Sequence, residues 1–308
     1  SISEECIGQQ DKLIKMLIEI KRAYAVANRQ FKIIDGDHYL NIIAACDWLL
    51  DNPDQWLVLF SVDVFHGGAG TSTNMNVNEV IANMALKEAG LPFGNYSSIH
   101  PIDHVNASQS TNDVYPSALK LAVYTELDEL IHSLDILVIE LEAKASSFES
   151  LLKIGRTQLQ DAVPMQVSQE LRAAKNQLKV ISRQLGKARE ELLILNLGGT
   201  AIGTSINAPK GLSDFVVIEL RNIILDSDFI ASTSDSSVFV SVSGYVKRAA
   251  IQLSKIASDF RLLSSGPRAG FNEYVLPQRQ AGSSIMPGKI NPVIPESLNQ
   301  AAFWYVGM

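Results

Sequence analysis

Apolar residues recur at steps of three and four along two long segments, Leu119–Leu141 and Val167–Leu195. These steps place apolar side chains on one helix face, and about four heptads of them in the second segment are typical of a coiled-coil seam. At ~1.5 Å per residue, each helix would be about 45 Å long. A helix this long cannot bury its apolar stripe alone. The pattern therefore predicts an all-α, long-helix bundle completed by partner subunits.

Shorter periodic segments and the polar runs between them complete the prediction. Further helices are expected at 12–29, 39–50, 79–89, 236–263 and from near 293. Loops are expected at 66–76, 100–113, 154–161, 198–211 and 264–292. Most connections in helical bundles have about 2–8 residues, so the length of the last loop favours a function beyond connecting two helices.

Composition narrows the class of protein. The 308 residues are 46% hydrophobic, which suffices for a sizeable core, and the net charge of −7 argues against nucleic acid as a partner. No apolar run approaches the ~18 residues that span a membrane. Only two cysteines and no signal-peptide pattern predict a cytoplasmic protein. Both ends of the chain fall within helix-compatible sequence, so a longer chain trimmed at both ends is expected.

The stretch AGSSIMPGKINP at Ala281–Pro292 is rich in glycine, proline and polar residues. Its lysine suggests a phosphate loop, but the Walker pattern needs four residues between its glycines and a hydroxyl residue after the lysine. Here five residues separate Gly282 from Gly288, and Ile290 stands in the hydroxyl position. No buried strand is expected before the stretch. We therefore exclude a phosphate loop.

The paired serines of this stretch, Ser283 and Ser284, suggest serine chemistry. The S-x-x-K pattern of acyl-enzymes fails, because the serines precede Lys289 by six and five residues. A serine can act as a base if backbone N–H groups and a nearby cation stabilise its oxyanion. The loop would then close over a substrate whose carboxylate Lys289 and Asn291 hold. An exposed loop without chemistry explains the residues equally well, so both readings stay open at this point.

The segment GRTQLQDAVP at 155–164 precedes the second long helix. We expect Asp161 to cap that helix and Pro164 to lie in its first turn. Thr157 and Gln158 would then project from a loop near the helix N-terminus, where the helix dipole favours anions.

Two earlier loops add further neutral hydrogen-bond donors. The donors are Thr71 and Asn74 in 67–76, and Ser110, Thr111 and Asn112 in 100–113. The histidines and aspartate that begin at His100 suggest a metal, but their spacing matches no standard zinc site, so no metal site is predicted. The donors instead favour a small dicarboxylate that undergoes proton chemistry without a cofactor.

Five blocks resemble the aspartase/fumarase superfamily over nearly the whole chain. They are GAGTSTNMNVNEVIAN, HPIDHVNASQSTND, GRTQLQDAVPM, SSGPRAGFNE and GSSIMPGKINP. The aspartase branch is the nearer one, because this chain has GRTQLQDA, LPQRQAGSS and NPVIPE, where fumarases typically have GRTHLQDA, NEPGSS and NPTQ.

The resemblance implies an architecture. It implies a homotetramer whose long helices form a core of twenty helices, with each active site shared among three subunits. Residues 1–109 would be the remainder of an N-terminal domain with active-site loops, and 110–308 the central long-helix bundle domain. The C-terminal domain of the family would be absent.

The resemblance also implies roles for individual residues. Ser283 would be the base, and Lys289 and Asn291 would bind the carboxylate and stabilise a doubly charged aci-carboxylate intermediate. The remaining substrate contacts would come from Thr71, Ser110, Thr111, Asn112, Thr157 and Gln158. Supporting positions would be His100, Ser284 and Glu296.

Gln158 bears on the leaving group. Fumarases have a histidine there, paired with a glutamate that corresponds to Glu296. Loss of hydroxide needs a general acid, whereas an ammonium group leaves as neutral ammonia without one. We therefore expect reversible deamination of L-aspartate to fumarate and ammonia, with no required cofactor and with activation by a divalent cation left open. The alternatives are a fumarate hydratase or another fumarate-forming lyase, and an inactive structural bundle.

Overall fold

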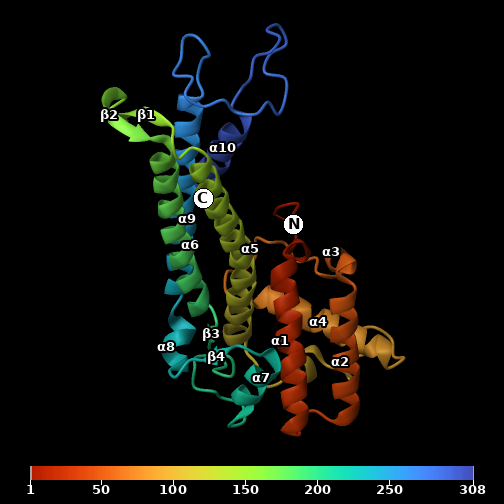
Figure 1. Cartoon of the computed structure of the whole chain (residues 1–308). Coiled ribbons are helices and arrows are strands. Elements are labelled where there is room, and N and C mark those ends of the chain that lie inside the picture. The colour runs from red at the N-terminus through yellow and green to blue at the C-terminus, as the bar shows by residue number, and fades with distance from the viewer. Residues whose placement is uncertain (1, 308) are drawn as a thin grey trace. The chain divides into compact units, whose positions relative to one another are not determined.

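A computed structural model describes residues 2–307 of the chain and is largely helical (Figure 1). No helix within those residues is both long and apolar enough to cross a membrane. The chain divides into two compact units. Unit 1 comprises Ser1–Asp128 and Arg189–Val238, and unit 2 comprises Glu129–Ala188 and Phe239–Met308. The helices that continue from one unit into the other are α5 (Thr111–Ser147), α6 (Val167–Glu191) and α9 (Ser237–Leu263).

Unit 1 is built on α1 (Asp11–Gln30), whose apolar side chains recur at helical spacing and include the fully buried Ile14, Leu17 and Tyr24. Its packing partners are α2 (Gly36–Asp51), α4 (Thr71–Glu88) and α7 (Leu212–Leu220). The shorter elements are η1 (Ile7–Gln9), η2 (Pro53–Gln55), α3 (Trp56–Leu59), the π-helix η3 (Pro101–Val105), α8 (Phe229–Ser234) and the parallel strands β3 (Ile194–Leu195) and β4 (Ile224–Leu225).

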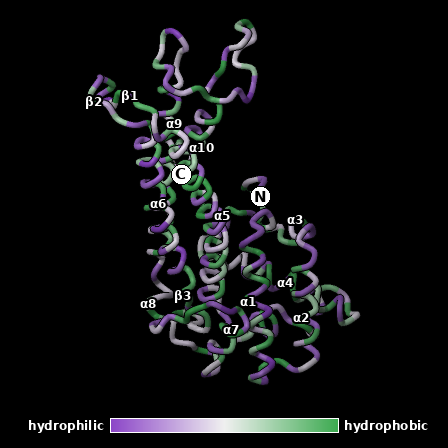
Figure 2. Tube along the Cα trace, in the orientation of Figure 1, coloured by the Kyte–Doolittle hydropathy of each residue, from purple (hydrophilic) through white to green (hydrophobic). Residues whose placement is uncertain are grey.

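Unit 2 combines parts of α5, α6 and α9 with further elements of its own. These are α10 (Val293–Gly307) and an antiparallel hairpin of β1 (Leu152–Thr157) and β2 (Gln160–Gln166). Hydrophobic and hydrophilic residues alternate along α6 (Figure 2), which buries Leu171, Leu178 and Leu185. A polar contact adds to this seam, since Ser182 Oγ of α6 donates to Asp135 Oδ1 of α5 at 2.7 Å.

The predicted long helices are confirmed, and so are the shorter ones at 12–29 and 39–50. The prediction that 66–76 is entirely loop was wrong, because α4 begins at Thr71 and not near residue 79. Gly70 ends the preceding turn with a φ of 79°, and Asn74 and Asn78 are buried on the helix that follows. Their amide nitrogens both donate to Asn106 Oδ1, so these polar residues fit a helix.

The prediction that 154–161 is a loop was also wrong, because these residues belong to the β1–β2 hairpin. Thr157 pairs with Gln160 across the two-residue turn Gln158–Leu159, whose φ angles are 50° and 63°. Positive φ at both turn residues matches the twist of the strands. Asp161 and Pro164 therefore lie in β2 and do not cap or begin the helix, which starts at Val167.

Candidate active site

The predicted site residues divide between the two units. Unit 1 contains Thr71, His100, Ser110, Thr111 and Asn112. Unit 2 contains Thr157, Gln158, Ser283, Ser284, Lys289, Asn291 and Glu296. The two groups differ in how their side chains are held.

In unit 1, the N-termini of α4 and α5 meet. The Tyr115 ring of α5 packs on Gly70 so closely that an added Cβ would lie 2.4 Å from it. Asn74 Nδ2 of α4 donates to Thr111 Oγ1, the first residue of α5, at 3.1 Å. Thr71 is the first residue of α4 and is exposed. Unpaired N–H groups and helix dipoles at such termini favour an anion, so this corner suits a carboxylate.

A buried polar network lies beneath these helix starts. Fully buried Lys21 donates to Asn106 Oδ1 at 3.2 Å and to Gln109 Oε1 at 3.1 Å. Asn106 Oδ1 also accepts from Asn74 and Asn78, each at 3.2 Å. Burial lowers the pKa of Lys21 to about 7, an effect that a neighbouring carboxylate opposes. The network fixes Asn74, and through it the Thr111 hydroxyl.

The segment Ser110–Asn112 is held by one bond within it and by two bonds to residues 196–201. Ser110 Oγ accepts from the N–H of Asn112 at 3.2 Å. Asn112 Nδ2 donates to Ala201 O at 2.8 Å, and Asn112 O accepts from Asn196 Nδ2 at 3.1 Å. The structure thus brings together the predicted donors of the 100–113 segment and a second segment at 196–201.

His100 stands at the start of the π-helix η3 and contacts none of those donors. Its Nδ1 accepts from the N–H groups of Ile102 and Asp103, both at 3.2 Å. Its own N–H donates to His104 Nδ1 at 2.9 Å. Throughout residues 2–307, no group of three or more His, Cys, Asp or Glu side chains is arranged to hold a metal ion. His100 caps η3, and its supporting role toward a substrate stays a prediction.

In unit 2, Thr157 and Gln158 lie exposed at the tip of the hairpin. An ion-pair network holds the base of this hairpin. Lys153 of β1 lies 2.7 Å from Glu170 and 2.8 Å from Glu273, and Arg156 also pairs with Glu273. Although burial raises the pKa of Glu273, hydrogen bonds from the two cations lower it below its ordinary value.

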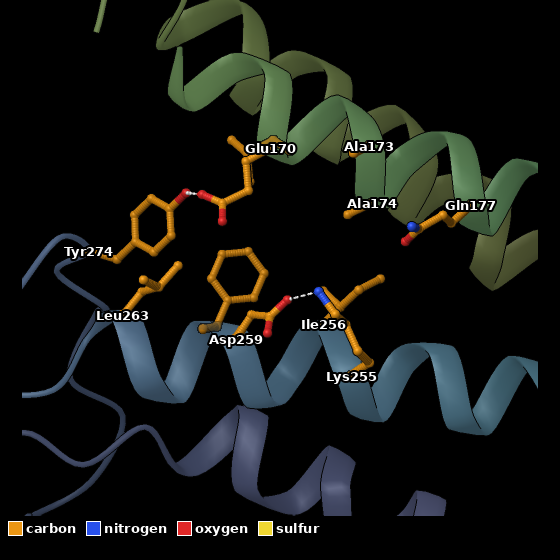
Figure 3. A pocket seen from close by; sticks show the side chains of 11 residues that line it. Glu170, Ala173, Ala174, Gln177, Lys255, Ile256, Asp259, Leu263 and Tyr274 are labelled. Carbon is orange, nitrogen blue, oxygen red and sulfur yellow. Dashed lines mark hydrogen bonds and ion pairs between the residues drawn. The ribbon is translucent and has the colours of Figure 1, made fainter. Parts of the chain in front are cut away.

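The same network borders a cavity of about 110 Å³ between α6 and α9. Figure 3 shows Tyr274 and Glu170 at one end of this cavity, where Tyr274 Oη donates to Glu170 Oε2 at 2.9 Å. The cavity is small and largely lined by apolar side chains, and the hydrogen bond at its end anchors the segment that leads into residues 282–291.

The stretch at 282–291 is a loop closed by its own contacts. Asn291 Nδ2 donates to Gly282 O at 2.9 Å. Gly282 approaches Lys289 so closely that an added Cβ would lie 2.0 Å from its carbonyl oxygen. Ser283 Oγ accepts from the N–H groups of Ile285 and Met286, each at 3.2 Å. The loop therefore presents a half-buried serine oxygen to two backbone donors.

Lys289 is exposed and lines a pocket of about 460 Å³. Met286, Pro287 and several residues between Ser264 and Leu276 also line it. Ser283 is not among the residues that line this pocket. Ser284 is exposed, and Glu296 lies half-buried in the first turn of α10. Within unit 2, Asn291 thus bonds to the residue before Ser283, while Lys289 lines a separate pocket.

Lys21, Asp113 and Glu273 support the predicted site residues and were missed from the sequence. For Lys21 a signal existed, because it falls on the apolar face of the helix at 12–29, between Leu17 and Tyr24. Burying a charged side chain at such a position costs free energy unless it has hydrogen-bond or charge partners, so its presence indicates a buried polar network.

A family model described as lyase matches residues 3–307. The chain belongs to the lyase family. Aspartate ammonia-lyase from Escherichia coli (strain K12) is 46% identical over 311 residues, which cover 99% of this chain and 65% of the relative. Aspartate ammonia-lyase from Pseudomonas aeruginosa is 50% identical over 309 residues, covering 98% of this chain and 64% of the relative.

Among solved structures, fumarate lyase:delta crystallin from Brucella melitensis bound to cobalt matches with a TM-score of 0.95 and 45% identity, covering 100% of this lyase chain and 67% of that chain. The predicted membership, an aspartase-like member of the fumarase/aspartase superfamily with an all-α bundle fold, is confirmed. The chain spans between 59% and 67% of the length of the curated aspartate ammonia-lyases it matches.

Proposed function

We propose that this lyase deaminates L-aspartate to fumarate and ammonia. The observation that carries the proposal is the setting of Ser283, whose Oγ accepts two backbone N–H groups at 3.2 Å. Such donors stabilise an alkoxide, which makes a serine able to act as a base. The similarity to aspartate ammonia-lyases supports aspartate as the substrate.

The proposed reaction has two steps. The Ser283 alkoxide removes a proton from the carbon next to the β-carboxylate, and the electron pair moves into that carboxylate as an aci-carboxylate dianion. The electrons then return to form the double bond, the carbon–nitrogen bond breaks, and ammonia leaves. Lys289 and Asn291 are proposed to bind the dianion, where electrostatic stabilisation matters most. The chemistry needs no cofactor, because no electrons are gained or lost overall: the proton goes to Ser283, and the carbon–nitrogen bonding pair leaves with ammonia.

Gln158 supports an amine as the leaving group. Its neutral side chain lies exposed at the hairpin tip and can accept a hydrogen bond from an ammonium group. It cannot donate the proton that loss of hydroxide requires. Thr71, Ser110, Thr111, Asn112 and Thr157 are proposed to supply the remaining substrate contacts, supported by His100, Ser284 and Glu296.

We also propose a cytoplasmic homotetramer with active sites shared among three subunits. Large apolar side chains are exposed on the long helices of unit 2, which favours burial against other copies of the chain. They include Ile136, Ile139, Val240, Ile251, Ile294, Phe303 and Trp304. Both cysteines are free thiols, which fits a reducing compartment.

The test follows fumarate absorbance after addition of aspartate or malate. We expect fumarate from aspartate and at least 100-fold less from malate, since Gln158 provides no acid for the hydroxyl group (~2.7 kcal/mol). Turnover of malate without turnover of aspartate would replace the proposal with a hydratase. Absence of fumarate from both substrates would favour the inactive bundle.

A further inference from the structure

Asp113 is the third residue of α5 and is fully buried. Its Oδ1 accepts the N–H of Ser110 at 2.9 Å, which is the contact of an ordinary capping box. A capping box uses one carboxylate oxygen and is usually exposed. Here Oδ2 accepts two more N–H groups, from Gly198 at 3.1 Å and from Thr200 at 3.0 Å. Helix capping alone therefore does not account for Asp113.

The segment that supplies these donors is shaped around the carboxylate. Gly198 and Thr200 both have positive φ, 87° and 57°. An added Cβ on Gly198 would lie 1.9 Å from Ser213 Oγ, so only glycine fits there. Thr200 is β-branched and buried, and such a residue rarely adopts this φ. The N–H groups of these two residues point at one carboxylate oxygen, that of Asp113, while the N–H of Gly199 between them donates to Asn196 O at 2.9 Å.

The same two segments are joined again beside the carboxylate. Asn112 Nδ2 donates to Ala201 O at 2.8 Å, and Asn196 Nδ2 donates to Asn112 O at 3.1 Å. Asp113 is flanked on the α1 side by Tyr24, whose Oη lies 3.5 Å away, and by the charge of Lys21. Asp113 thus joins the donor segment, through the N–H of Ser110, to the turn at 198–200 and to Tyr24 of α1.

We propose that Asp113 is a positioning residue for substrate binding, because its buried carboxylate ties the donor segment Ser110–Asn112 to the turn at 198–200. The inference rests on the proposed function of Ser110, Thr111 and Asn112. Neutral donors bind a carboxylate well only when they are held in place before the substrate arrives. Asp113 supplies that constraint without touching the substrate.

Asp113→Asn is the sharpest test, because it keeps the shape and replaces one acceptor oxygen with an N–H donor. At least one of the three backbone donors then loses its acceptor. We expect KM for aspartate to rise about tenfold or more while kcat stays within threefold. Asp228→Asn is the matched control, since Asp228 also accepts two backbone N–H groups, from Ile230 and Ala231, but is exposed at the N-cap of α8. The control should leave both constants unchanged.

Amide hydrogen exchange separates this inference from the proposed function. In Asp113→Asn, the amides of Ser110, Gly198 and Thr200 should exchange at least tenfold faster, whether or not the wild type acts on aspartate. If these exchange rates in Asp113→Asn equal those of the wild type, the inference is overturned. It is also overturned if the rates rise but an active Asp113→Asn enzyme keeps the wild-type KM for aspartate. If Asp113→Asn does not fold, Asn196→Ala takes its place, because it removes the hydrogen bond from Asn196 to Asn112 O. In that variant, an unchanged KM together with an unchanged exchange rate at Asn112 would overturn the inference.

Discussion

The donor residues of unit 1 and the loop residues of unit 2 are held in opposite ways. Ser110, Thr111 and Asn112 rest on buried groups, and two of these groups, Asn74 and Asn196, come from distant parts of the sequence. Within residues 2–307, Ser283 Oγ accepts from the N–H groups of residues two and three positions further along its own loop. Buried, long-range bonds are lost only when much of the unit opens, whereas local exposed bonds break easily. In the proposed mechanism, unit 1 therefore provides a preformed binding surface, and unit 2 provides a base that can move.

The largest expected effect comes from removing the base. Ser283→Ala should lower kcat for aspartate by about 10³-fold, which lies within the usual range for a general base. The melting temperature should stay unchanged, because the Ser283 side chain contacts only its own loop. Ser232→Ala, which removes an exposed hydroxyl bonded within α8, should change neither quantity. Retention of more than a tenth of the activity by Ser283→Ala would remove Ser283 from the mechanism.

Lys21 should give unit 1 a distinctive dependence of stability on pH. The unfolded lysine keeps its proton up to about pH 10.4, whereas folded Lys21 releases it above about 7. Between these values the unfolded state binds more protons, so the free energy of unfolding should rise with pH, by at most about 1.4 kcal/mol per pH unit. Urea unfolding from pH 7 to 10 measures this slope.

Lys21→Met should flatten that slope, since the titrating group is gone. Lys15→Met on the same helix is the control, because the Lys15 side chain is half exposed, and it should keep the wild-type slope. An identical slope in Lys21→Met and the wild type would mean that Lys21 does not titrate in this range.

Substitution of Glu273 should have a smaller effect than substitution of Ser283 or Lys21. Glu273→Gln weakens the pairs to Lys153 and Arg156 that hold the hairpin carrying Gln158. We expect kcat/KM for aspartate to fall about tenfold, because displacement of a substrate contact by a fraction of an ångström is costly. Asp259→Asn, in an exposed pair on α9, should change it less than twofold. Equal losses in the two variants would argue against a positioning role for the network.

The sequence predicted the elements that have a periodic apolar pattern and missed those that depend on contacts between distant residues or on an atypical turn. The long helices were found because their apolar residues repeat over many turns. The β1–β2 hairpin was missed because its turn, Gln158–Leu159, lacks the glycine or asparagine typical of positive φ. The start of α4 was missed because Asn74 and Asn78 suggest a loop until their shared partner, Asn106, is known.

Site residues followed the same rule. The loop serines, Lys289 and Asn291 could be singled out from one contiguous stretch. Asp113 could not, because its second oxygen binds amides more than eighty residues away along the chain. No local pattern encodes such a contact, and only the folded chain reveals it.

Native-state hydrogen exchange of the wild-type protein tests the contrast between the two units most directly. The amides of Ser110, Gly198 and Thr200 should exchange only through large-scale opening of unit 1. The amides of Ile285 and Met286, which donate to Ser283, should exchange at least 100-fold faster. Similar rates for the two sets would contradict the account, because the base would then be held as firmly as the donors.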